Sequence, residues 1–290
     1  MARPRTPRPR ARRNSSKRSP APRRGSAAAP RRGPAPAPRR GSAAAPRRGP
    51  APAPRRGPAP APRHAPSADP ERTLARQPWS SLRAFLPGAA GDQDRVLARL
   101  RAFALELLQW NRGVSNLISH ADESRLVERH IAESLAGASV LRELAPNHIV
   151  DLGSGGGFPA LPLAIAGIGA RWTLVESRRN KTLFLRRALE RLELQDIKVM
   201  TGRLEVLVDD EHDALRCDGF TSRATMRAGP TLALAARIVR SGGHAVLWKG
   251  SGLEQELVEK SADWRSSWSA PRTLPIGAGP NSIAVFERST

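Results

Sequence analysis

The sequence contains no tyrosine and only one cysteine, Cys217, among its 290 residues. A single cysteine excludes an intrachain disulfide and a cysteine-rich metal site, and it fits a reducing compartment. No apolar run approaches the ~20 residues that a membrane-spanning helix needs. The N-terminus also lacks the apolar core of a secretory signal. We therefore expect a cytoplasmic protein that binds no metal and does not enter a membrane.

Acidic residues are absent before Asp69, whereas residues 1–67 contain 19 arginines and lysines. Because the whole chain has a formal net charge of +22, the remainder carries +3. Between Arg23 and Pro62 an eight-residue unit, RRGSAAAP or RRGPAPAP, occurs five times without a large apolar residue. The repeats predict a disordered tail over residues 1–70, partly in polyproline II. Its arginine pairs would act as a nonspecific RNA tether, and the alternative is an expanded repeat without a role.

Residues 78–146 are expected to form an N-terminal helical cap. Apolar residues at i, i+3, i+4 and i+7 predict an amphipathic helix over 92–111, which Gly113 would end. A second helix is expected over 123–144, because one apolar face runs along it and Pro146 follows.

From residue 147 to 290 the pattern alternates strands and helices, which predicts a mostly parallel sheet covered on both faces. The expected strands are 149–152, 172–176, 198–201, 219–222 and 244–248. The expected helices are 159–167, 180–193, 226–240 and 253–263. The last two strands, 268–276 and 282–286, have only a turn between them, which predicts antiparallel pairing. This α/β arrangement resembles the Rossmann-like class I methyltransferases that use S-adenosylmethionine.

The stretch IVDLGSGGGFP, residues 149–159, joins the first of these strands to its helix. A glycine-rich turn there lets backbone N–H groups approach a ligand where side chains would block it. The dinucleotide fingerprint G-x-G-x-x-G is not met, since its third glycine position is Phe158. The pattern D-x-G-x-G-x-G is met by Asp151, Gly153, Gly155 and Gly157. It resembles the first motif of S-adenosylmethionine methyltransferases, and a linker loop is the disfavoured alternative.

Further ligand contacts are expected where the following strands end, because ligands of such sheets bind beyond the carboxyl ends of the strands. Glu176 ends the second strand, and a carboxylate there could accept hydrogen bonds from both ribose hydroxyls. Leu204 follows the third strand and would lie on the face of the adenine. Arg223 ends the fourth strand and would point at the same crevice. The alternatives are a solvated acid for Glu176 and a surface charge for Arg223.

Five stretches together resemble the RsmG (GidB) family. They are WNRGVSNLI (110–118), VERHIAESL (127–135), DLGSGGGFPALPLAI (151–165), LVESRRNKTLFLRRALERLEL (174–194) and DGFTSRA (218–224). The resemblance implies methyl transfer from S-adenosyl-L-methionine to N7 of a guanine in 16S rRNA of the small ribosomal subunit. The cofactor contacts that it implies are Gly153, Phe158, Leu204, Glu205 and Arg223. The general fold adds Asp151, Gly155 and Glu176 to these. The RNA contacts that the resemblance implies are Arg129, His130 and Lys249.

Guanine N7 has a lone pair in the ring plane and no proton, so its methylation needs no general base. We expect no catalytic acid or base and assign the rate gain to orientation and desolvation. A chain without tyrosine also lacks the NPPY or DPPY tetrad of amino-group methyltransferases. A methyltransferase with another substrate and a non-catalytic RNA-binding module remain alternatives, and the loop pattern disfavours an oxidoreductase. A lone histidine such as His130 is more often a packed or capping residue than a ligand.

Overall fold

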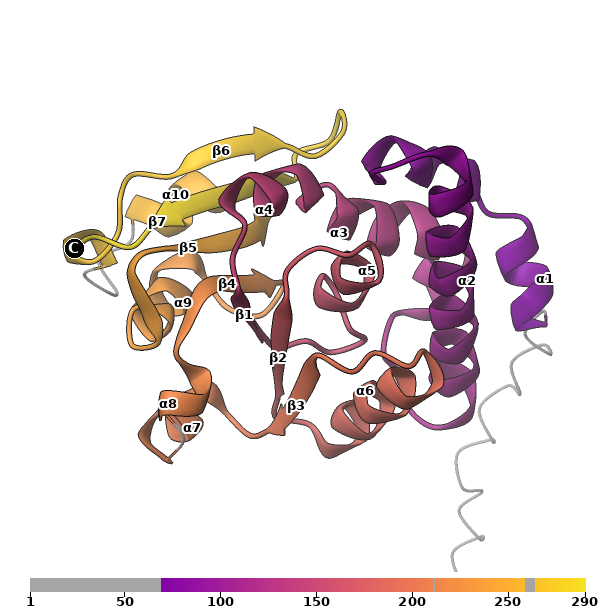
Figure 1. Cartoon of the computed structure of the whole chain (residues 1–290), viewed down its shortest axis with the longest axis horizontal. Coiled ribbons are helices and arrows are strands. Elements are labelled where there is room, and N and C mark those ends of the chain that lie inside the picture. The colour runs from indigo at the N-terminus through magenta and orange to yellow at the C-terminus, as the bar shows by residue number, and fades with distance from the viewer. Residues whose placement is uncertain (1–68, 211, 259–263) are drawn as a thin grey trace, which may run out of the picture. The chain divides into compact units, whose positions relative to one another are not determined.

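The computed structural model describes residues 69–210, 212–258 and 264–290 (Figure 1). The expected disordered tail lies outside the described residues except for its last two positions. There Asp69 accepts a hydrogen bond from the Glu71 N–H at 3.3 Å and caps helix α1 (Pro70–Ala75). Helix α1 therefore precedes residue 78, the expected start of the helical cap.

Seven strands form one sheet in the order β3-β2-β1-β4-β5-β7-β6. Their bounds are β1 (His148–Leu152), β2 (Arg171–Glu176), β3 (Ile197–Thr201), β4 (Cys217–Arg223), β5 (Val239–Lys249), β6 (Arg272–Pro275) and β7 (Ser282–Glu287). The first five pair in parallel, whereas β7 is antiparallel to both β5 and β6. This order and the antiparallel end confirm the expected Rossmann-like class I methyltransferase fold.

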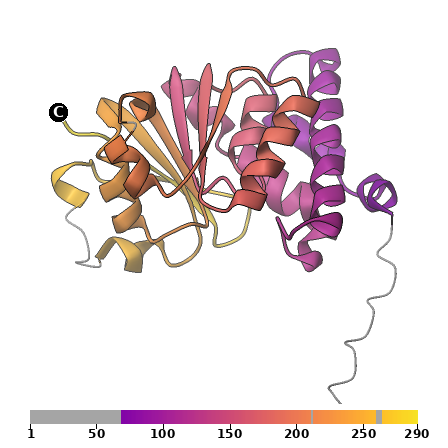
Figure 2. The same ribbon diagram turned by 90° about the horizontal axis from the view of Figure 1, so that it is seen from below.

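Helices cover both faces of the sheet (Figure 2). One face packs against α2 (Ala90–Gly113), α5 (Ala160–Ile165) and α6 (Arg179–Arg191). The other packs against α7 (Leu204–Asp210), α9 (Ala228–Ala235) and α10 (Leu253–Val258), and α8 (His212–Leu215) follows α7. Side chains alternate between faces along a strand, so Val246 and Trp248 join the first core and Ala245 and Leu247 the second. No helix of these described ranges is long and apolar enough to cross a membrane.

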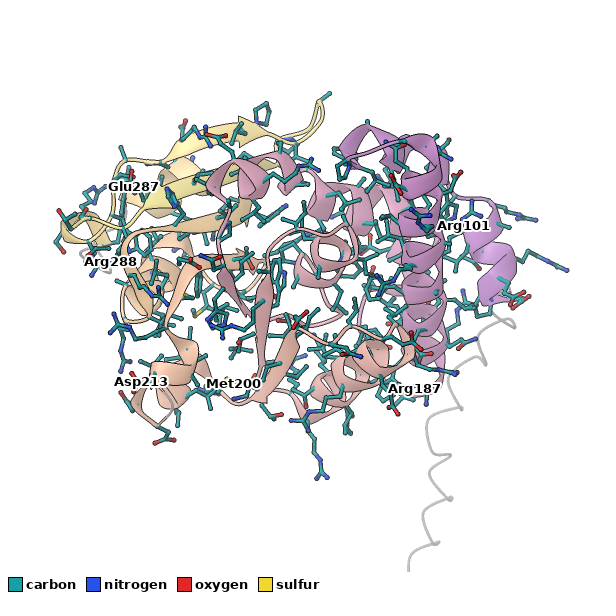
Figure 3. All side chains as sticks on the ribbon, viewed as in Figure 1. Arg101, Arg187, Met200, Asp213, Glu287 and Arg288 are labelled. Atoms are coloured by element: carbon teal, nitrogen blue, oxygen red, sulfur yellow. The ribbon has the colours of Figure 1, made fainter. Side chains whose placement is uncertain are left out.

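The segments before β1 share a core with the first face of the sheet. Leu100 and Phe103 of α2 are fully buried in the same cluster as Ile149. The 3₁₀ segment η1 (Trp79–Phe85) precedes α2 and contacts it. The guanidinium of Arg101, which is labelled in Figure 3, lies 5.3 Å from the Trp79 ring centroid. A cap boundary at residues 146/147 stays a prediction.

The single helix expected over 123–144 is wrong, because the chain there forms four short pieces. They are the 3₁₀ segment η2 (His120–Arg125), the π-helical η3 (Leu126–Ala132), α3 (Glu133–Leu135) and α4 (Ala138–Leu144). The break between α3 and α4 lies at Gly137, against which the Trp248 ring packs. Trp248 Nε1 donates to the Glu133 carbonyl at 2.7 Å, so this carbonyl is engaged by β5 at the point where the helix breaks.

One other helix prediction is wrong, and two helices were not expected. The helix expected over 226–240 ends with α9, since Val239 already pairs with Cys217 of β4 as the first residue of β5. The α7 and α8 helices, between β3 and β4, were not predicted. The helix expected over 253–263 is described only as α10, and residues 259–263 lie outside the described ranges.

Gly137→Ala is expected to lower the free energy of unfolding by about 1–3 kcal/mol, the usual cost of overpacking. A Cβ at this position would lie 2.4 Å from Trp248 Cζ2, and the ring is held by its own hydrogen bond. Urea denaturation measures the change. The control is Gly113→Ala at the end of α2, where a Cβ meets nothing within 4 Å. Equal stability of the two variants would contradict the packing account.

Candidate cofactor and substrate site

The glycine-rich loop leaves β1 in a conformation that favours glycine. Gly153, Gly155 and Gly157 have φ angles of +72°, +54° and +89°. The N–H groups of Gly153 and Ser154 both donate to the Val175 carbonyl, at 2.8 and 3.2 Å. A Cβ on Gly153 would lie 2.0 Å from Thr225 Cγ2. The loop is therefore held between the end of β2 and the segment after β4.

Glu176 connects the ends of three strands. Its Oε2 accepts the Gly155 N–H at 3.0 Å, and its Oε1 accepts the Arg178 N–H at 2.8 Å. Its backbone carbonyl accepts the Gly202 N–H after β3 at 3.0 Å. The residue is buried, and each carboxylate oxygen keeps a further lone pair. The carboxylate thus has the acceptor capacity that a ribose diol requires.

Asp151 lies buried beneath the loop. Its Oδ1 accepts the Thr221 hydroxyl at 2.7 Å, while its Oδ2 has no hydrogen-bond partner among the described residues. Burial raises the pKa of Asp151 to about 7, and the neighbouring charge of Glu176 adds to this. The floor of the loop therefore holds a carboxyl group with unused hydrogen-bonding capacity.

Asp151→Asn is expected to remove a pH dependence of stability. Because the pKa of Asp151 in the folded state lies above its ordinary value of 3.8, the unfolded chain ionises first, and stability falls as pH rises from 4 to 7. A shift to about 7 corresponds to about 4 kcal/mol at most. Asparagine stays neutral, so the variant should gain stability relative to the wild type over this range. Urea denaturation of both proteins at pH 4.5 and 7.5 tests this. The same difference in unfolding free energy between variant and wild type at both pH values would contradict it.

Phe158, at the end of the loop, packs against His130 of η3. The two ring centroids are 5.0 Å apart, and Arg223 Cζ lies 6.0 Å from the Phe158 centroid. Burial and the charge of Arg223 lower the pKa of His130 to about 4, so the imidazole is neutral at pH 7. Its Nε2 is 3.7 Å from Asp122 Oδ2, beyond hydrogen-bond distance. The ring is packed on the loop, as the alternative reading of His130 expects.

Arg223 directs its guanidinium toward η3 and α3. Nη1 donates to the His130 carbonyl at 3.0 Å and to Ser134 Oγ at 3.2 Å. Nη2 donates to the Arg129 carbonyl at 2.7 Å and to Glu133 Oε2 at 2.6 Å. The side chain thus joins the end of β4 to the π-helical segment, and its cofactor contact stays a prediction. Glu133 is a site residue that the sequence does not predict, because its partners Arg223, Trp248 and Asn281 are all distant in the chain.

The two expected contacts after β3 differ in exposure. Leu204 is buried in the second core at the start of α7, and Glu205, next to it, is exposed. Their contact with an adenine stays a prediction.

A hollow of about 490 Å³ lies beside the loop at the carboxyl ends of β4 and β5. Among the residues that line it are Arg129, Arg223, Thr225, Met226, Trp248 and Lys249. The Lys249 ammonium donates to the Met226 carbonyl and to Glu256 Oε2, both at 2.7 Å. Two of the three expected RNA contacts, Arg129 and Lys249, therefore line one hollow, and His130 packs behind it.

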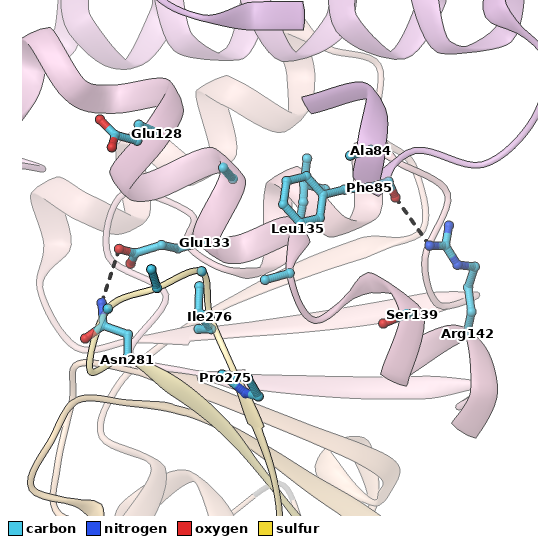
Figure 4. A pocket seen from close by; sticks show the side chains of 15 residues that line it. Ala84, Phe85, Glu128, Glu133, Leu135, Ser139, Arg142, Pro275, Ile276 and Asn281 are labelled. Carbon is cyan, nitrogen blue, oxygen red and sulfur yellow. Dashed lines mark hydrogen bonds between the residues drawn. The ribbon is translucent and has the colours of Figure 1, made fainter. Parts of the chain in front are cut away.

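A second hollow of about 480 Å³ lies between η1, α3, α4 and the turn joining β6 to β7 (Figure 4). It shares Glu133, Ile276 and Asn281 with the first, and Asn281 Nδ2 donates to Glu133 Oε1 at 3.2 Å. Thr225, which lies against Gly153 of the glycine-rich loop, lines the first hollow and not the second, so we place the site at the first hollow. Within the described ranges, no group of three or more histidine, cysteine or acidic side chains could hold a metal ion.

Comparison with known proteins gives a consistent set of relatives. The family described as GidB, rRNA small subunit methyltransferase G, matches residues 96–282. The protein named ribosomal RNA small subunit methyltransferase G from Gluconobacter oxydans is 39% identical over 182 residues, 62% of this chain and 89% of that protein. Its namesake from Xanthomonas oryzae pv. oryzae is 36% identical over 219 residues, 76% of this chain and 99% of that protein.

Proposed function

The chain belongs to the rRNA small subunit methyltransferase G family, and on this premise we propose that it methylates N7 of one guanine in 16S rRNA. The enzyme class is an S-adenosylmethionine-dependent rRNA methyltransferase. The proposal rests chiefly on one observation. Glu133 and Glu256, the carboxylates that line the hollow, are each paired with a cation, at 2.6 Å to Arg223 and 2.7 Å to Lys249. Such a site suits an acceptor atom that has no proton to lose.

The residues of the loop fit the cofactor. S-adenosylmethionine supplies an electrophilic methyl group on a sulfonium. Gly155 has a positive φ and no side chain, and the nearest atoms to its Cβ position lie 3.6 and 3.7 Å away, so a ligand can approach the backbone there. Glu176 would accept the ribose hydroxyls with its remaining lone pairs, and Asp151 would order the floor of the loop. Phe158 closes the side that faces His130.

The hollow receives the guanine. An enzyme that modifies a base must take it out of the stack, so the target is a guanine in a single-stranded or opened segment. Trp248 and Met226 provide apolar walls, and Arg129 and Lys249 lie at the hollow as phosphate-positioning cations. The chain orients N7 toward the loop and excludes water from its lone pair. A ribosomal RNA substrate places the protein in the cytoplasm, with the small ribosomal subunit as partner.

Mapping N7-methylguanine along 16S rRNA tests the proposal in cells that lack this protein. We expect one modified guanine to be lost and to return when the wild-type chain is supplied. A methylation pattern that is unchanged by the loss would contradict the proposed function.

A further inference from the structure

Five cations surround the carboxyl ends of β2 and β3, which we call the basic rim. Its members are Arg178, Arg179, Lys181, Arg186 and Arg203. All are exposed except Lys181, which is half-buried. Within the described ranges none of them forms an ion pair, whereas Arg129, Arg223 and Lys249 at the hollow all do. The rim therefore holds positive charge that the fold itself does not neutralise.

Hydrogen bonds fix the rim beside the proposed cofactor site. The Arg178 N–H and the Gly202 N–H both donate to Glu176. The backbone at Arg178 and the backbone just before Arg203 are therefore held by the same buried residue. Lys181 Nζ lies 3.7 Å from the position that a Cβ on Gly155 would take, which sets its ammonium against the loop. Arg186 Nη2 donates to Thr201 Oγ1 at 3.2 Å. Figure 1 shows α6 and α7, the helices that begin at these residues, on either side of β3.

Few acids oppose the rim. Glu176 is buried, and each of its carboxylate oxygens accepts a backbone N–H. Glu205, in the first turn of α7, is the exposed acid closest in sequence to Arg203. Arginine guanidinium groups match phosphate oxygens in a planar, two-point geometry. A polyanion with regularly spaced phosphates is therefore the partner that suits this surface.

We propose that the basic rim binds phosphates of the rRNA strand next to the target guanine, while the guanine itself occupies the hollow at β4 and β5. The inference rests on the proposed function, because it takes the substrate to be rRNA. The strand would run across the carboxyl edge of the sheet, from the ends of β3 and β2 to those of β4 and β5. The rim would add affinity and orientation without reading the base sequence.

The test is the full-length variant Arg178→Gln/Arg179→Gln/Arg203→Gln, assayed for methyl transfer to 16S rRNA. We expect KM for the RNA to rise about tenfold or more at 0.15 M salt, because about three phosphate contacts are lost. The slope of log KM against log salt concentration should fall by about 2, at about 0.7 per contact with a single strand. The kcat value and the Kd for S-adenosylmethionine should change less than about twofold, since neither depends on these phosphate contacts.

The matched control is Arg171→Gln/Arg216→Gln/Arg240→Gln, which removes the same charge from exposed arginines at the amino ends of the strands. The 19 cations of residues 1–67 are present in all three proteins, so their contribution cancels. An equal rise of KM in both variants would overturn the inference and leave the proposed function standing. Loss of cofactor affinity in the rim variant would also overturn it, by assigning these cations to the cofactor. A wild-type protein that methylates no RNA would instead refute the proposed function.

Discussion

Gly155→Asp is expected to abolish cofactor binding and to leave the fold intact. The φ of +54° lies in the left-handed region, which aspartate tolerates better than most residues. The nearest atoms to its Cβ would be 3.6 and 3.7 Å away, so the backbone need not move. The new carboxylate would enter the space kept for the cofactor, near both Glu176, which holds the Gly155 N–H at 3.0 Å, and the Lys181 ammonium. We expect affinity for S-adenosylmethionine, measured by calorimetry, to fall at least about 100-fold, or about 3 kcal/mol.

Gly167→Asp provides the control for this variant. Gly167 has a similar φ of +73°, no atom lies within 4 Å of its Cβ position, and it follows α5 at the other end of the βα unit. Both variants therefore carry the same substitution and the same backbone strain. Unchanged affinity in Gly155→Asp would mean that the loop does not hold the cofactor, and equal losses in both would point to the fold instead.

Arg223→Ala is expected to lower the free energy of unfolding by about 3 kcal/mol or more. The substitution leaves the Glu133 carboxylate without its cation and removes one donor from each of the carbonyls of Arg129 and His130. Both partners of the ion pair are well shielded, with side-chain exposures of 13% and 21%. Methyl transfer should also fall, because Arg223 holds the η3 wall of the hollow in place. Urea denaturation and turnover assays measure the two effects.

Arg95→Ala is the matched control, because its ion pair with Asp92 is highly exposed, at 79% and 56% of the side chains. Exposed pairs contribute about 0–1 kcal/mol. Arg223→Lys should lie between the two, since an ammonium keeps the charge but cannot form the guanidinium fork. If Arg223→Ala costs no more than Arg95→Ala, Arg223 is not the link between β4 and η3.

The sheet could be predicted from the sequence because each strand is marked by residues within the strand itself and in the turns next to it. Apolar runs bounded by turn residues give the strands, and the absence of a helix between the last two gives their antiparallel pairing. The loop could be predicted for a similar reason, since glycine is needed where the backbone takes a positive φ. The fold class and the place of the proposed cofactor site both follow from these patterns.

The wall of the hollow could not be predicted, because distant residues shape it. The helix expected over 123–144 breaks where Trp248, more than a hundred residues later, engages the Glu133 carbonyl. Gly137 within that stretch was the one local signal of a break. The carbonyl partners of Arg223 depend in turn on the π-helical form of η3, for which the sequence carries no recognisable pattern.

The most direct test of the account is methyl transfer in vitro. The purified full-length chain is incubated with S-adenosylmethionine carrying a labelled methyl group and with either 16S rRNA or small ribosomal subunits, and the RNA is digested to nucleosides. We expect all label incorporated by the wild type to be in N7-methylguanosine, and we expect Gly155→Asp to incorporate none. Label in protein or in another nucleoside, or no transfer by a wild-type chain that binds the cofactor, would contradict it.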